Sequence, residues 1–214
     1  MNEMIDGTSC ASGDCGASSK WSLVKTALDA ALPLYDSTVK WSLKLFASAD
    51  ANNTSTCAVS QGAEISPAFS NAAAIAARLD TIVASTSTPT TAAETAAARY
   101  LSSIVDAAPK YILLITDGIP TCGKEACAPD ATGQISNQCD DANAIAAVQA
   151  AHDTVGIPTM VVGIGTALGA GEDTLGKMAV AGGLPRAASP AYYPVQTTAD
   201  LMVAIQTLTA TAVP

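Results

Sequence analysis

The sequence has little positive charge, few aromatic residues and a single histidine. Its 10 Lys and Arg residues are outnumbered by 19 Asp and Glu residues, which gives a formal net charge of −9 at pH 7. Proteins that bind nucleic acid or an anionic membrane surface use clustered Lys and Arg, so we expect neither as a partner. Aromatic residues make up 4% of the chain, and we therefore expect an aliphatic core.

Long hydrophobic runs are also missing, although the chain as a whole is apolar. No stretch reaches the roughly 20 residues that span a bilayer, and no signal peptide precedes the first predicted element. We therefore expect no membrane span, and a mature chain from which any export signal has been removed. With 49% hydrophobic and 14% charged residues, the composition predicts a sizeable core, and 214 residues fit one domain covering 1–214.

The cysteines are even in number, which favours disulfide bonds and an oxidising, extracytoplasmic compartment. Zinc is the alternative, but it normally needs closely spaced cysteines with histidine partners. The one histidine, His152, lies away from them. Six cysteines allow 15 pairings, and the sequence selects none of them. The disulfide candidates are Cys10, Cys15, Cys57, Cys122, Cys127 and Cys139.

Hydrophobic periodicity predicts strands that alternate with helices along the chain. Strands are expected over residues 2–5, 39–46, 57–65, 111–116, 159–164 and 192–195. Helices are expected over residues 20–32, 68–83, 91–105, 140–152, 172–180 and 199–208. This order predicts an α/β fold: a doubly wound, mostly parallel sheet of about six strands with helices on both faces. One antiparallel edge hairpin is expected near residues 39–65.

Three loops with hard oxygen ligands are predicted at one edge of this sheet. Ligands of open α/β sheets bind outside the carboxyl ends of the strands. Asp6 and Thr8 follow the first predicted strand, Thr88 precedes a helix, and Asp117 follows the apolar strand 111–116. Carboxylate and hydroxyl oxygens suit Mg²⁺, with Mn²⁺ or Ca²⁺ as alternatives. The cysteines occupy the same loops or the neighbouring hairpin, so we expect disulfides to brace this edge.

These loops resemble the metal-ion-dependent adhesion site (MIDAS) of von Willebrand factor A domains, also called integrin I-type domains. That site combines D-x-S-x-S, a distant Thr and a T-D-G turn. Asp6 and Thr8 match the first motif, Thr88 the threonine, and Asp117 the last aspartate; the run Ile-Leu-Leu-Ile-Thr-Asp-Gly at 112–118 is the most specific match. Nearly the whole chain is similar to secreted bacterial members. Cys10 stands where the family has its second serine, and a thiol is a poor Mg²⁺ ligand.

The resemblance implies a non-enzymatic cell-adhesion domain, secreted or in the cell envelope. It would bind a protein partner, whose acidic side chain would complete the coordination of a divalent cation. The last helix, residues 199–208, would be the one that shifts with ligand binding. The alternative is a structural or assembly module that keeps the fold without a working metal site, since Cys10 cannot replace serine.

No assembled catalytic group is evident, so we expect no enzymatic activity. Ser22 and Lys25 match S-x-x-K, but the S-D-N and K-T-G motifs that accompany it in penicillin-recognising enzymes do not follow. The glycines between Gly163 and Gly169 do not have the spacing of a dinucleotide-binding loop. His152 lies near Asp153 at a predicted helix end, and no nucleophile accompanies it.

Overall fold

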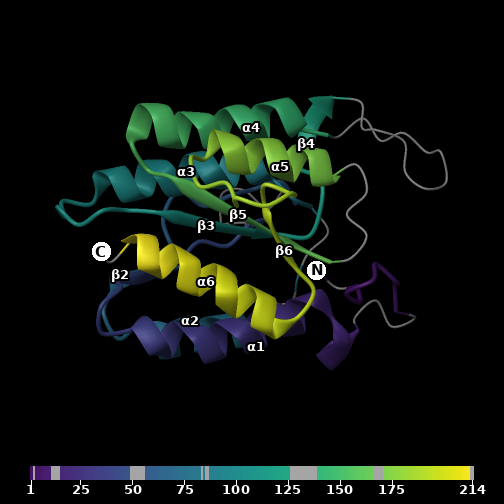
Figure 1. Ribbon diagram of the computed structural model, residues 1–214, viewed down its shortest axis with the longest axis horizontal. Helices are drawn as coiled ribbons and strands as arrows, with labels where there is room; N and C mark the ends of the chain where they lie inside the picture. The colour runs from purple at the N-terminus through teal and green to yellow at the C-terminus, as the bar shows by residue number, and fades with distance from the viewer. Residues whose placement is uncertain are drawn as a thin grey trace.

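The computed structural model describes residues 1, 3–10, 15–48, 56–82, 84, 87–125, 139–165 and 171–212. In this part of the chain, two layers of helices enclose a layer of strands (Figure 1). The α/β class predicted from the sequence is confirmed. No described helix is long and apolar enough to cross a membrane.

The main sheet has three parallel strands in the order β3-β5-β6. Their bounds are Ile112–Thr116 for β3, Thr159–Ile164 for β5 and Tyr193–Val195 for β6. β5 matches its predicted range and is buried along its whole length. A parallel strand covered by helices on both faces is expected to be a continuous apolar run. The sequence of β5, Thr-Met-Val-Val-Gly-Ile, fits this expectation.

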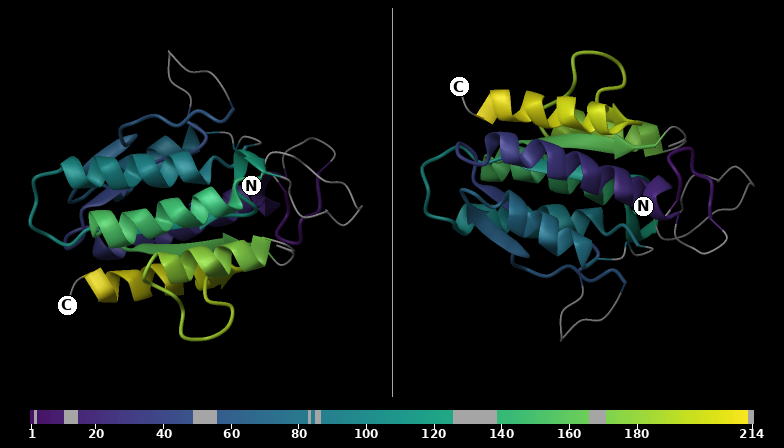
Figure 2. Two further views of the ribbon diagram at one scale, coloured as in Figure 1. Left: turned by 90° about the horizontal axis from the view of Figure 1, so that it is seen from above. Right: turned by 90° about the horizontal axis from the view of Figure 1, so that it is seen from below.

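The helices form two layers, one on either side of the strands (Figure 2). One layer consists of α3 (Thr90–Ser103), α4 (Asp141–Ala150) and α5 (Gly171–Ala181). The other consists of α1 (Lys20–Ala31), α2 (Ala72–Asp80) and α6 (Thr198–Ala212). The larger core cluster joins this second layer to β5 and β6, and a smaller one joins α4 and α5 to the opposite face of β3 and β5.

The start of two helices is set by a side chain that accepts backbone N–H groups, as expected at helix N-termini. Ser19 Oγ accepts from Ser22 N at 3.0 Å and caps α1. Asp36 Oδ1 accepts from Asn71 N at 2.8 Å and from Ala72 N at 3.1 Å. For this reason α2 begins at Ala72, later than the predicted start at residue 68.

β1 (Trp41–Leu43) and β2 (Ile65–Ala68) form a separate two-stranded antiparallel sheet. The antiparallel pairing is confirmed, but its second strand begins at Ile65, the last residue of the predicted range 57–65. Within that range side chains take the backbone groups: Ser60 N donates to Ser48 Oγ at 3.0 Å, and Leu45 N to Glu64 Oε2 at 2.6 Å. Such bonds compete with strand pairing. The predicted single sheet of about six strands is thus only partly present.

The strand predicted over residues 2–5 is reduced to a single bridge between Met4 and Ser19. The backbone of this segment is hydrogen-bonded to the first residues of α1, and it does not pair with β3. Trp21 N donates to Met1 O at 3.0 Å, and Lys20 N to Glu3 O at 2.9 Å. These bonds satisfy N–H groups that the first turn of a helix leaves without a partner. β4 (Thr121–Glu125) likewise belongs to neither sheet.

Candidate functional site

Asp117 lies directly after β3, at the edge where ligands of open α/β sheets bind. Its carboxylate accepts a hydrogen bond from the terminal ammonium of Met1, and Lys20 Nζ lies 3.6 Å away. The Asp117 side chain is 17% exposed, whereas that of Lys20 is only 5% exposed. Lys20 also pairs with Glu3 at 3.1 Å. The carboxylate therefore holds two cationic groups of its own chain at a point that solvent reaches.

Asp6 lies in an exposed turn beside this group. Thr8 N donates to Asp6 Oδ1 at 2.9 Å, and Gly7 takes a positive φ of 85° that favours glycine. The hydrogen bond from the Thr8 backbone holds the pKa of Asp6 below its usual value, and the positive charge of Lys20 adds a smaller effect. Lys20 thus acts electrostatically on Asp6 and directly pairs with Asp117.

The loop before α3 is tied to the loop after β3. Thr88 N donates to Thr121 Oγ1 at 2.7 Å, and Thr121 N donates to Thr88 O at 2.8 Å. Thr91, one residue into α3, donates to Asp140 Oδ2 at 2.6 Å, and Asp140 directly precedes α4. Three segments far apart in the sequence are therefore held together at the carboxyl edge of the sheet.

Disulfides brace the same edge, as the sequence predicts. Cys10 is bonded to Cys15, and Cys57 to Cys122. Cys139 is also disulfide-bonded, while Cys127 lies outside the described residues. Because Cys10 is in a disulfide, it offers neither a thiolate nor a hydroxyl to a cation at the position of the family's second serine.

The predicted metal ligands are only partly brought together. Asp6 contacts Thr8, Thr88 contacts Thr121, and Asp117 contacts Met1 and Lys20. Within the described ranges, no three or more His, Cys, Asp or Glu side chains are grouped so that they could hold a metal ion. The donor chemistry of two carboxylates and two hydroxyls suits a hard cation, and the four-residue site stays a prediction.

Sequence reasoning missed Lys20 and the Met1 amino group as partners of Asp117. A usable signal was present for Lys20. A lysine in the first turn of a helix opposes the helix dipole, so its place there indicates another partner. For the Met1 amino group no sequence pattern gives a signal, because the contact spans 116 positions.

A second ionisable group, Glu94 on α3, is buried away from this edge. Thr159 Oγ1, at the start of β5, donates to Glu94 Oε1 at 2.5 Å. Burial raises the pKa of Glu94 to about 7, against the opposing effect of the Thr159 hydrogen bond. Of the other residues weighed from the sequence, His152 is partly exposed and lies 2.8 Å from Asp153.

The fold and this edge define an α/β domain with a loop-built, disulfide-braced rim. No protein-family model matches the chain, and no curated protein matches it. Its structure is similar to that of the pilus adhesin SpaC from Lactobacillus rhamnosus GG, with a TM-score of 0.58 and 10% sequence identity. The match covers 99% of this chain but 29% of the adhesin, so the chain spans less than a third of that protein. At this identity the likeness shows a shared fold.

Proposed function

We propose that this chain is an extracytoplasmic adhesion domain that binds a protein partner at the rim around Asp117. The observation that carries the proposal is the Asp117 carboxylate, which holds two cationic groups at the carboxyl end of β3 and is open to solvent. Open α/β sheets bind their ligands at this edge.

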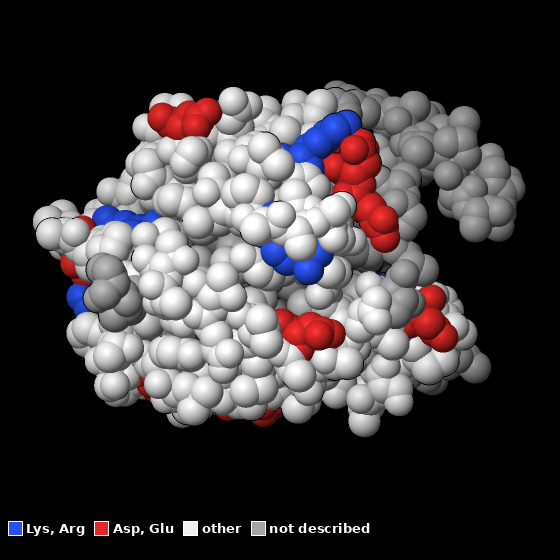
Figure 3. Space-filling view, viewed as in Figure 1, with Lys and Arg blue, Asp and Glu red and all other residues white. Residues whose placement is uncertain are grey.

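Two further observations support this function. The disulfides of the described cysteines suit an oxidising compartment, and a protein described as a pilus adhesin contains the same fold. On the face seen in Figure 3, Lys and Arg side chains are few and separated from one another. This surface does not resemble the basic stripe of a nucleic-acid-binding protein.

The finer part of the proposal is a divalent cation at this rim, Mg²⁺ or alternatively Mn²⁺ or Ca²⁺. Asp6, Thr8, Thr88 and Asp117 would hold it, and an acidic side chain of the partner would complete its coordination. The cation would supply a positive centre that bridges the two proteins. Asp117 must then release the ammonium groups of Met1 and Lys20, which compete for the same oxygens.

The test is thermal unfolding in Mg²⁺, in Mn²⁺ and in EDTA for wild type, Asp117→Asn and Asp173→Asn. Asp173 is a matched control because its side chain is exposed and pairs with Lys177 on the same helix. A ligand present at ~100 times its Kd stabilises the folded state by about 2.7 kcal/mol. We expect this gain in wild type and in Asp173→Asn, and its loss in Asp117→Asn. An equal response of all three proteins would remove the cation from the proposal.

A second candidate is a binding or assembly module without metal, and the ion pairs of Asp117 favour it. If Met1 and Lys20 permanently neutralise this carboxylate, no cation is needed. Lys20→Met separates the two candidates, because methionine keeps much of the side-chain volume and removes the charge. With a cation site, the variant binds Mg²⁺ more tightly than wild type. Without one, the variant is less stable and does not respond to Mg²⁺.

A further inference from the structure

Cys122, in the rim segment that follows β3, has a backbone conformation that its side chain disfavours. Its φ is 80°, and a residue with a Cβ atom is strained at positive φ. In the part of the chain that the structure describes, Ser70 is the one other non-glycine residue with a positive φ, and it lies in the turn before α2. Strain of this kind persists where the surroundings enforce it, and it is common at functional sites.

The bond to Cys57 is positioned to enforce the conformation of Cys122, because it joins this residue to a segment 65 positions away. The segment that carries Cys57 is itself fixed. Ser48 N donates to Ala58 O at 2.8 Å, and Ser48 forms a bridge with Val59. Both cysteines of the bond are half-buried, so a thiol in solution can reach it.

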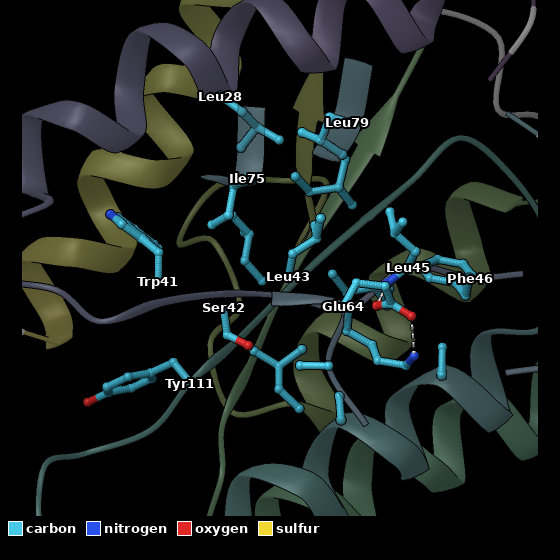
Figure 4. A pocket seen from close by; sticks show the side chains of 18 of the residues that line it. Leu28, Trp41, Ser42, Leu43, Leu45, Phe46, Glu64, Ile75, Leu79 and Tyr111 are labelled. Atoms are coloured by element: carbon cyan, nitrogen blue, oxygen red, sulfur yellow. Dashed lines mark hydrogen bonds and ion pairs between the residues drawn. The ribbon is translucent and has the colours of Figure 1, made fainter. Parts of the chain in front are cut away.

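This disulfide joins two sheets that lie on either side of an apolar cavity. The cavity has a volume of about 1190 Å³, and every residue of β1 and of β3 lines it. Leu28, Ile75 and Leu79 reach it from α1 and α2 (Figure 4). Thr88 and Asp117, which belong to two loops of the rim, line it as well. Packing below these loops is therefore incomplete, and a covalent bond across the two sheets contributes more to holding them than it would above a filled core.

The conformation of Cys122 is linked to the Thr88 loop through Thr121. Thr88 N donates to Thr121 Oγ1 at 2.7 Å, and Thr121 N donates to Thr88 O at 2.8 Å. On the other side of Cys122, Gly123 is packed so closely that a Cβ atom there would overlap the carbonyl oxygen of Cys139. A rotation about φ of Cys122 therefore moves Thr121 relative to Gly123, and the Thr88 loop moves with Thr121.

We propose that the Cys57–Cys122 disulfide is a redox latch on the Thr88 loop of the rim. While the bond is closed, Cys122 keeps its positive φ and Thr121 holds Thr88 in place. A dithiol opens the bond by exchange: one thiolate attacks a sulfur and forms a mixed disulfide, and the second thiol then closes the reductant's own disulfide. Two electrons and two protons pass to Cys57 and Cys122, which become thiols. Cys122 then returns to a negative φ and releases the loop.

As a control of binding, this latch rests on the proposed function, because Thr88 is one of the four predicted cation ligands. The closed bond keeps the Thr88 hydroxyl at the rim with Asp117. The open bond separates them, so the reduced protein is expected to bind the cation and the partner less well.

The experiment measures amide hydrogen exchange at Thr88 and Thr121 in the full chain, in EDTA. Two double variants lack the bond: one has Cys57→Ala with Cys122→Ala, the other Cys57→Ala with Cys122→Gly. Both lose the same covalent link, but only glycine accepts a positive φ without strain. Relative to the amides of β5, which report global stability, we expect Thr88 and Thr121 to exchange roughly tenfold faster with alanine at position 122 than with glycine.

The matched control is Cys10→Ala with Cys15→Ala, which removes another disulfide of the same edge and leaves Cys122 bonded. We expect it to keep the slow exchange of wild type at Thr88. After treatment with dithiothreitol, the same protein is expected to reach the rates of the alanine variant once alkylation and mass spectrometry show Cys57 and Cys122 as thiols.

Equal exchange with alanine and with glycine at position 122 would overturn the latch, because the bond would then not set the φ of this residue. Equally fast exchange in the Cys10–Cys15 control would overturn it as well, since any loss of bracing would then release the loop. These rates are measured without a cation or a partner. A wild type that does not respond to Mg²⁺ would therefore refute the cation proposal, while the difference between the alanine and glycine variants would still support the latch.

Discussion

β3 and β5 are neighbouring strands of one sheet with similar aliphatic sequences, yet only β5 is buried throughout. β5 has a strand on each side, whereas β3 has β5 on one side and the cavity on the other. Leu114 and Thr116 of β3 are buried, while Leu113 and Ile115 are only half-buried. The burial of a strand thus depends on its neighbours as much as on its own residues.

The largest expected effect comes from the Cys57–Cys122 disulfide. This bond joins a segment ahead of β2 to β4, which follows β3, and so ties the two sheets together over a separation of 65 residues. Replacing both cysteines by serine should lower the free energy of unfolding by about 4 kcal/mol in the chain-entropy account. Removing Cys10–Cys15, which closes a separation of five residues, should cost about 2 kcal/mol.

Urea unfolding of the two double variants measures this difference. Equal losses of unfolding free energy in the two double variants would mean that packing, and not the Cys57–Cys122 bond, mainly holds the two sheets together.

The next largest effect is the loss of stability when a side chain of β5 or of β3 is shortened. Met160 of β5 and Leu113 of β3 are register partners and can be compared directly. Met160 is buried in the main core, whereas Leu113 lines the cavity and is half-buried. Met160→Ala should cost about 3–4 kcal/mol and Leu113→Ala about 1 kcal/mol, because a truncated residue beside an existing cavity loses fewer packing contacts. Urea unfolding at one pH gives both values.

Glu94 gives a pH-dependent effect. Its pKa is raised by burial to about 7 in the folded chain, so between the unfolded value and pH 7 the folded state binds a proton that the unfolded state does not. Stability from this group is therefore full at acid pH and is lost as the pH rises toward 7. Glu94→Gln can keep the hydrogen bond from Thr159 and removes the titration. We expect the variant to be more stable than wild type by roughly 3 kcal/mol above pH 7.

Unfolding free energies between pH 4.5 and 8 check this, with the exposed Glu172→Gln as the control. A wild-type curve that rises over this interval as steeply as that of Glu94→Gln would contradict the raised pKa.

Much of the fold was predictable because its signals are local. The aliphatic run of β5 gave its bounds, and the strand-helix alternation gave the α/β class and the two helix layers. The position of β2 was not predictable, because it depends on two bonds that a local pattern does not show: Ser60 N donates to the Ser48 side chain, and Leu45 N donates to the Glu64 side chain. The open edge of β3 was not predictable either, since nothing in Ile112–Thr116 indicates which strand lies beside it.

The candidate site also has a part that the sequence predicts and a part that it does not. The T-D-G turn placed Asp117 correctly at the end of a parallel strand, because that position follows from the strand alone. Its partners Met1 and Lys20 come from elsewhere in the chain, so their contacts depend on how distant segments pack and not on the strand. The grouping of Asp6, Thr8 and Thr88 with Asp117 around a cation remains a prediction for the same reason.

The smallest expected effect is that of the Lys40–Asp106 ion pair, which also reaches from one sheet to the other. Lys40 precedes β1, Asp106 lies in the loop before β3, and their charged atoms are 2.5 Å apart. The hydrogen bond from Lys40 is the main cause that lowers the pKa of Asp106, so any stabilisation exists above the unfolded pKa and is lost as the pH falls. The Lys40 side chain is 39% exposed and that of Asp106 is 27% exposed, and water and salt weaken such pairs. Lys40 also lies 5.1 Å from the centre of the Phe69 ring, a contact that survives without Asp106. We therefore expect Asp106→Asn to leave the urea midpoint at pH 7 unchanged within error. A midpoint shift as large as that from loss of Cys57–Cys122 would mean that surface charge, and not the covalent bond, sets the spacing of β1 and β3.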